Sequence, residues 1–209
     1  MNFTSLIQKF PAVCEFYWNG KWQRGTRYYR TVTGKQLVDV RTILDSTCTE
    51  IIELGDTISG ETKSHDETAL ACLREVARRT RYVSDITKYG HPEHWQEAPE
   101  TFALETGDCE DGSVLLMKLM QAAHIPAWRR KLCCGWVKNN NDKGGHAYVI
   151  YLAEDFQWYV LDWCYWYIEC IVAFGKQPHS SRTNKYLDIW FTFNEKNCWP
   201  NQTTTVIKW

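Results

Sequence analysis

Apolar positions in the middle of the chain follow the period of a helix, and those beyond it follow the period of strands. The helical spacing covers Val114, Leu115, Leu116, Leu119, Met120 and Ala123. Pro126 prevents this helix from continuing. The run Gly107-Asp108-Cys109-Glu110-Asp111-Gly112 comes just before it and is rich in loop-forming residues. We therefore predict a buried helix that carries Cys109 on its first turn.

A second helix is predicted to begin near Ser64, whose hydroxyl can cap it, with Glu67 completing a capping box three residues later. Its apolar stripe consists of Leu70, Leu73, Val76 and Ala77. The stripe predicts an amphipathic helix of about four turns. Residues 1–60 predict irregular, partly extended structure, and residues 86–106 predict a long ordered loop or short helical turns leading to Cys109.

Apolar and polar residues alternate after residue 127, and this pattern predicts strands over 128–137, 146–152 and 158–163. Residues 138–145 are polar and glycine-rich, and they predict a flexible loop. A turn near residue 154 or 155 joins the last two strands, so paired residue numbers add up to about 308 to 310. This register places His146 opposite Asp162 or within two residues of it. Residues 186–193 and 203–209 alternate like further strands.

Composition places the chain among globular proteins. It has 209 residues, of which 44% are hydrophobic and 23% charged, and the formal net charge is −1. A net charge of −1, without a long run of Lys and Arg, argues against nucleic acid as a main partner. The first residues lack a signal-peptide pattern, and no stretch approaches the roughly 20 apolar residues that span a bilayer. We therefore expect a cytoplasmic protein with no membrane partner, while the oligomeric state stays open.

Nine cysteines are present, with no Cys-x-x-Cys pair that would indicate a zinc or redox site. Without a secretory signal, most are expected to be reduced, small, buried hydrophobic residues. Cys133 and Cys134 fall in a predicted strand, where alternation sends one side chain inward and the other outward. No metal and no cofactor is expected.

Three residues together suggest nucleophilic catalysis. The partial positive charge of a helix N-terminus favours the thiolate of Cys109. His146 is a candidate base, and Asp162 is a candidate carboxylate to fix the tautomer of the imidazole. Each residue taken alone is compatible with a purely structural role. Their agreement with one helix-then-hairpin geometry favours a Cys-His-Asp triad.

These motifs carry a resemblance to a known family. The segments are Glu93-His94-Trp95-Gln96-Glu97-Ala98-Pro99-Glu100-Thr101, Gly107-Asp108-Cys109-Glu110-Asp111-Gly112, Gly145-His146-Ala147-Tyr148-Val149 and Val160-Leu161-Asp162. In this order they resemble the core of the transglutaminase-like superfamily, and most closely its bacterial and phage cysteine-peptidase branch. The resemblance covers roughly residues 65 to 170.

The resemblance implies an α+β fold with a papain-like core, in which the nucleophile helix packs on an antiparallel sheet. It implies Cys109 as nucleophile, His146 as general base and acid, and Asp162 as the orienting residue. Residues 1–60 are then expected to form an N-terminal extension packed on a catalytic domain of residues 61–209, as one compact unit. A phage-encoded protein of this kind would act in the cytoplasm of its host.

The expected activity is that of a cysteine peptidase or related amide hydrolase acting on a protein or peptide through an acyl-enzyme. Animal cross-linking transglutaminases have Trp directly after the nucleophile, where this chain has Glu110, which favours hydrolysis. Transamidation, a peptidoglycan-directed amidase and a non-catalytic binding module stay open as alternatives. Substrate identity is not legible from the sequence.

Further site residues are expected around this triad. The backbone N–H of Cys109 is a natural oxyanion donor, and Gln96 or Trp95 is expected to supply the second. Trp128 and Trp163 are candidates for an aromatic substrate cleft. Asp108 and Asp111 are explained as carboxylates favoured at a helix N-terminus. Calcium binding, known among relatives of this branch, is an alternative that two acidic residues alone do not establish.

Overall fold

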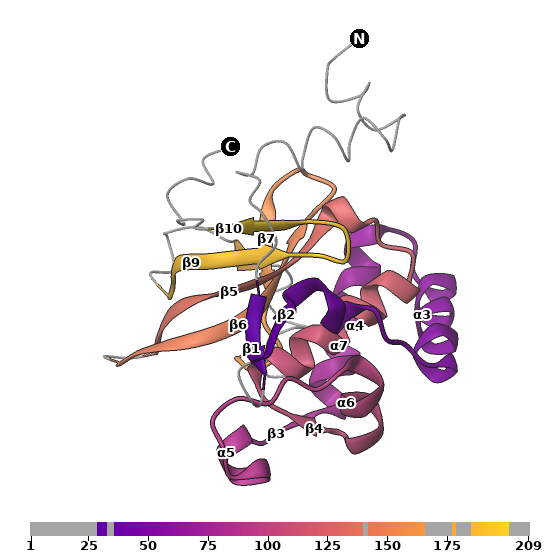
Figure 1. Ribbon diagram of the computed structural model, residues 1–209. Coiled ribbons are helices and arrows are strands. Elements are labelled where there is room, and N and C mark those ends of the chain that lie inside the picture. Colours follow the sequence, from indigo (N-terminus) through magenta and orange to yellow (C-terminus); the bar gives the residue numbers. More distant parts are fainter. Residues whose placement is uncertain (1–28, 33–35, 140–141, 166–176, 179–184, 201–209) are drawn as a thin grey trace.

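The computed structural model describes residues 29–32, 36–139, 142–165, 177–178 and 185–200. The elements in chain order are β1 (Tyr29–Val32), β2 (Gln36–Asp39), η1 (Val40–Leu44), α3 (Thr49–Glu61), α4 (His65–Arg79), β3 (Arg81–Tyr82), α5 (Asp85–Tyr89), α6 (Ala98–Leu104), β4 (Thr106–Gly107), α7 (Cys109–Ala122), η2 (Ala127–Arg129), β5 (Arg130–Asn139), β6 (Asp142–Leu152), β7 (Trp158–Leu161), β8 (Gln177–Pro178), β9 (Tyr186–Phe193) and β10 (Cys198–Pro200). The helices gather on one side of a large sheet (Figure 1).

The large sheet has six strands in the order β10-β9-β5-β6-β7-β8, and every neighbouring pair is antiparallel. Its longest ladder joins β5 to β6 and runs from the Arg130–Tyr151 pair to the Asn139–Asp142 pair. The predicted flexible loop over 138–145 is therefore wrong for residues 138–139 and 142–145, and residues 140–141 lie outside the described residues. Backbone pairing along this ladder outweighs the turn propensity of the asparagines and glycines.

The hairpin of β6 and β7 confirms the predicted register. Val149 pairs with Leu161 and Leu152 pairs with Trp158. Asp162 follows the last paired residue of β7 directly, so it lies at the end of the strand that neighbours His146. The strand predicted at 186–193 is also confirmed as β9, whereas residues 203–209 lie outside the described residues.

Helix α7 is the centre of the core. Every residue from Glu110 to Met120 is buried. The helix packs against the sheet on one side and against α3, α4 and α6 on the other (Figure 1). The predicted capping of α4 is confirmed, because the Ser64 hydroxyl accepts a hydrogen bond from the N–H of Glu67 at 3.1 Å.

The prediction of irregular structure for residues 1–60 is wrong where α3 forms. Gly55 and Gly60 lower the helix propensity of this segment. Packing explains why a helix forms nevertheless: a Cβ atom at Gly55 would lie only 2.4 Å from the Cβ of Ala122. The glycine thus lets α3 approach the C-terminal end of α7. Val40, Ile43, Leu44, Ile51 and Ile58 belong to the same core cluster as α7.

Both faces of the sheet are buried, which corrects the expectation for the paired cysteines. Cys134 belongs to the main core with α7, and Cys133 belongs to a second cluster on the opposite face. The second cluster is rich in aromatic residues: Trp128, Tyr148, Trp158, Tyr186 and Trp199. It also accommodates the buried Lys131, whose Nζ lies 3.3 Å from the centre of the Trp199 ring. Both cysteines are therefore small core residues.

All seven cysteines of the described segments are free thiols: Cys48, Cys72, Cys109, Cys133, Cys134, Cys164 and Cys198. No helix in these segments has the length and apolar character needed to cross a membrane.

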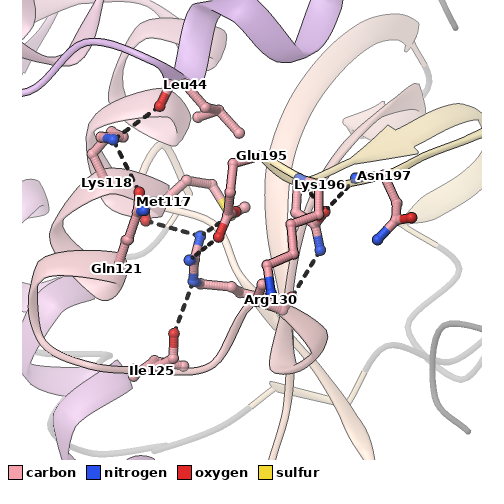
Figure 2. A network of polar contacts seen from close by, with 11 residues as sticks. Leu44, Met117, Lys118, Gln121, Ile125, Arg130, Glu195, Lys196 and Asn197 are labelled. Carbon is pink, nitrogen blue, oxygen red and sulfur yellow. Dashed lines mark hydrogen bonds and ion pairs between the residues drawn. The ribbon is translucent and has the colours of Figure 1, made fainter. Parts of the chain in front are cut away.

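A buried ion pair ties the C-terminal end of α7 to the sheet (Figure 2). The Arg130 guanidinium lies 2.7 Å from the carboxylate of Glu195, in the turn between β9 and β10. It also donates to the backbone carbonyl oxygens of Ile125, at 3.0 Å, and Met117, at 3.4 Å. Nearby, the Lys118 ammonium donates to the carbonyl oxygen of Leu44 at 2.9 Å. The network thus links three separate parts of the chain to α7.

Glu195→Gln is expected to lower the free energy of unfolding by about 3 kcal/mol, because it leaves the charge of Arg130 buried without its partner. The matched control is Glu105→Gln, which removes an exposed ion pair with Arg79 and should cost less than about 1 kcal/mol. Urea denaturation of the two variants measures the difference. Equal losses would show that the buried pair has no special structural role.

Candidate active site

The first turn of α7 docks on the edge of β6 beside the end of β7. The hydroxyl of Ser113 donates to the carbonyl oxygen of Cys109 at 2.7 Å and lies 3.3 Å from the carbonyl oxygen of Ala147. The backbone N–H of Ala147 lowers the pKa of the Cys109 thiol, against the larger effect of burial. The Ala147 backbone thus lies next to the nucleophile turn and bonds to it through its carbonyl oxygen. This contact places the sulfur next to the residue that follows His146.

His146 and Asp162 form a buried pair. Nε2 of His146 lies 2.8 Å from Oδ2 of Asp162, and both side chains are shielded from solvent. The carboxylate has two further donors: the hydroxyl of Tyr186 at 2.8 Å and the N–H of Cys164 at 3.0 Å. A carboxylate held by three donors has a fixed orientation, and it fixes the imidazole ring in turn.

Sequence reasoning missed Tyr186. It lies on β9, distant in sequence from the predicted triad. The alternating pattern of residues 186–193 identified it only as a residue of a strand. The part of β9 that carries it pairs with β5 opposite Val137. Nothing in the local sequence signals the contact with Asp162, because it depends on the order of strands in the sheet.

Trp163 supports the nucleophile turn from the side. Its indole N–H donates to the carbonyl oxygen of Cys109 at 3.3 Å. Its ring also covers Gly112, where a Cβ atom would lie 2.2 Å from the indole. The side chain is only 5% exposed, so its main contacts are with α7. Trp163 approaches α7 so closely here that only glycine fits at position 112.

The environment of Cys109 favours the neutral thiol in the free protein. Burial and the neighbouring Glu110 raise the pKa of the thiol, while the N–H of Ala147 lowers it. The sulfur lies 3.1 Å from Oε2 of Glu110. Burial and the adjacent Asp108 raise the pKa of Glu110 to about 10, so this carboxyl is protonated at neutral pH. The helix N-terminus alone does not produce a thiolate, and a base is required.

The other predicted site residues have different surroundings. Gln96 is fully buried, and its backbone N–H and side-chain amide donate to Asp111 at 2.8 and 2.7 Å. The indole N–H of Trp95 donates to Glu93 at 3.2 Å. The oxyanion role of either residue stays a prediction. Trp128 lies in the aromatic cluster on the opposite face of the sheet from α7.

Three buried carboxylates meet beside the nucleophile turn. Asp85, Asp108 and Asp111 each offer an oxygen within 4.8 Å of the others. Burial raises the pKa of Asp85, and it raises the pKa of Asp111 to about 7. Among the described residues, Oδ1 of Asp85, Oδ1 of Asp108 and Oε1 of Gln96 have no hydrogen-bond partner. Oxygen donors of this kind suit a hard cation such as Ca²⁺.

Tyr186→Phe is expected to lower the free energy of unfolding by about 2 kcal/mol, because it removes a buried donor from a carboxylate. Tyr159→Phe serves as the control, since the Tyr159 hydroxyl donates to a carboxylate, Asp155, in an exposed setting at 2.6 Å. This second change should cost less than about 1 kcal/mol. Thermal and urea unfolding compare the two. If Tyr186→Phe lowers the free energy of unfolding no more than Tyr159→Phe does, Tyr186 does not hold Asp162.

Comparisons with known proteins agree with this fold. The structure is similar to LapG of Legionella pneumophila in its EGTA-treated form, with a TM-score of 0.53 and 13% identity over 80% of this chain and 89% of that chain. It also matches calcium-bound LapG, with a TM-score of 0.48 and 15% identity over 71% and 87% of the two chains. A candidate cysteine protease of Cytophaga hutchinsonii matches with a TM-score of 0.45 and 18% identity over 72% and 50%.

Comparison with the sequences of curated proteins finds no match. The model of the transglutaminase-like superfamily matches residues 52–163, which include Cys109, His146 and Asp162. This span is more than half of the 209 residues. The α+β architecture, with a buried helix on an antiparallel sheet, is the one that the sequence motifs imply. The chain therefore belongs to the transglutaminase-like superfamily.

Proposed function

We propose that this protein is a cysteine peptidase in which Cys109 is the nucleophile, His146 the general base and acid, and Asp162 the orienting carboxylate. The observation that carries the proposal is the Ser113 hydroxyl, which bridges the carbonyl oxygens of Cys109 and Ala147 next to the buried pair of His146 and Asp162. The substrate is a protein or peptide.

The reaction begins when His146 takes the proton of the Cys109 thiol and the sulfur attacks the carbonyl carbon of an amide. The backbone N–H of Cys109 has no acceptor within the helix, so it is available to the oxyanion. Collapse of the tetrahedral intermediate breaks the C–N bond, and His146 gives its proton to the departing amine. Water, deprotonated by His146, then attacks the thioester carbon, the C–S bond breaks and the acid is released, and the imidazolium returns its proton to the Cys109 sulfur. Asp162 stabilises the imidazolium in both steps.

Transamidation is the alternative for the second step, with an amine in the place of water. Glu110 follows the nucleophile here, where animal cross-linking transglutaminases have Trp, and its buried carboxyl contacts the sulfur. We favour hydrolysis for this reason. Product analysis with and without an added primary amine separates the two, because only transamidation incorporates the amine.

Cys109→Ala is expected to abolish cleavage of a library of internally quenched peptides, and His146→Ala to reduce it by about 10²- to 10⁴-fold. The control is Cys48→Ala, which removes another partly exposed thiol. This variant should cleave at the wild-type rate. Cleavage that persists in Cys109→Ala would contradict the proposal, and so would a loss shared equally by the control.

We also propose that Asp85, Asp108 and Asp111 bind a calcium ion. Calcium-bound LapG of Legionella pneumophila gives a precedent within the fold. The argument for this chain is the cluster itself, because three buried carboxylates repel one another and two of them offer unpartnered oxygens. The ion would neutralise this charge and hold the segment before Cys109 against α5.

Millimolar CaCl₂ is expected to raise the melting temperature by about 5 °C, and EGTA should reverse the rise. Asp85→Asn should remove the calcium-dependent shift. Asp188→Asn, which alters an exposed carboxylate on β9, should retain it. Differential scanning fluorimetry in CaCl₂, MgCl₂ and EGTA gives the comparison. No calcium-dependent shift in the wild type would refute the site.

A further inference from the structure

Five large apolar side chains of the described residues are exposed: Ile52, Tyr82, Ile86, Leu104 and Trp190. Two of them, Tyr82 at the end of β3 and Ile86 on the first turn of α5, flank the short segment that joins these elements. Tyr82 is 54% exposed and Ile86 is 64% exposed. These are the largest exposed fractions of the five. Exposed apolar side chains that lie together near a functional site often mark a surface that binds a ligand or partner.

This segment runs alongside the nucleophile turn. Strand β3 is parallel to β4, and Tyr82 pairs with Gly107, two residues before Cys109. The N–H of Asp85 donates to the carboxylate of Asp108 at 3.3 Å. Backbone contacts therefore fix both ends of the stretch from Tyr82 to Asp85 against the start of α7. Ile86 follows directly, on the first turn of α5.

The ring of Tyr82 also contacts the residue that supports Cys109. Its centroid lies 6.1 Å from that of Trp163, whose indole N–H bonds to the Cys109 carbonyl. Partial burial, followed by the acidic groups around it, raises the pKa of the Tyr82 hydroxyl, which is neutral at physiological pH. By contrast, the acidic residues around the nucleophile, Asp108 and Glu110, are both buried. Tyr82 is thus an exposed, uncharged side chain beside the turn that carries Cys109.

We propose that the exposed side chains of Tyr82 and Ile86 form a binding surface for an apolar side chain of the substrate, next to the amide that Cys109 attacks. This inference rests on the proposed peptidase function and specifies its substrate class. Apolar area that stays exposed beside a nucleophile gains free energy when a substrate side chain covers it. Discrimination by such a surface reaches about tenfold or more between an apolar and a small polar side chain.

The test measures labelling of Cys109 by peptidyl chloromethyl ketones, which differ only in whether Phe or Ser precedes the reactive group. The sulfur displaces chloride and forms a thioether, so no turnover is needed. Each rate is divided by the iodoacetamide rate of the same protein, which cancels any change in the thiol itself. Mass spectrometry of the Cys109 peptide gives both rates.

The wild type is expected to prefer the Phe reagent about tenfold or more. Tyr82→Ser with Ile86→Ser should bring the ratio close to one. Tyr82→Phe alone should retain the preference, because it keeps the ring. The matched control is Ile52→Ser on α3, which packs at the opposite end of α7, and it should keep the wild-type ratio.

A preference that survives in the double variant, or that is absent from the wild type, would overturn the inference. The outcome is separable from that of the proposed function. A protein that prefers the Phe reagent but cleaves no peptide has the binding surface without the activity. A protein that cleaves peptides but shows no preference has the activity without the surface.

Discussion

The docking of the first turn of α7 on the edge of β6 is the contact on which the rest of the candidate site depends. The N–H and C=O of Ala147 lie at a point that β7 no longer covers, since β7 ends at Leu161. Both groups are buried, and buried backbone groups require partners. The Ser113 hydroxyl donates to the C=O, and the N–H lowers the pKa of the Cys109 thiol. The need to satisfy one residue's backbone therefore brings a thiol to the strand that carries His146.

Packing around α7 makes this docking rigid. At the N-terminal end, Trp163 lies on Gly112 and bonds to the Cys109 carbonyl. At the C-terminal end, the buried guanidinium of Arg130 bonds to Met117 and Glu195. A helix fixed at both ends and buried along its length cannot shift without exposing core residues. Catalytic geometry needs this rigidity, because small displacements of a nucleophile strongly reduce its rate.

Much of this arrangement is encoded in local patterns. The helical spacing after Cys109 and the strand alternation after residue 145 predicted α7 and the hairpin, and the hairpin register placed His146 near Asp162. These predictions succeed because burial of one face imposes a period on each element. The motif order also implied the superfamily, which the family match supports.

Other features depend on contacts between distant segments and have no local signal. Helix α3 contains Gly55, and only its packing against the end of α7 explains a glycine at this position. Residues 138–139 and 142–145 form strands, despite their polar composition, because each backbone finds its partner across the ladder. Tyr186 reaches Asp162 only through the strand order of the sheet. Asp85 joins Asp108 and Asp111 through the short parallel pairing of β3 and β4.

The most direct test of the account is the rate at which iodoacetamide alkylates Cys109 at pH 7, with and without His146. Since burial raises the pKa of the Cys109 thiol, its reactivity at this pH has to come from the imidazole. We predict that His146→Ala slows alkylation of Cys109 at least about tenfold and leaves the internal control, Cys48, unchanged. Equal Cys109 rates in the two proteins would contradict the claim that the fold delivers the sulfur to His146.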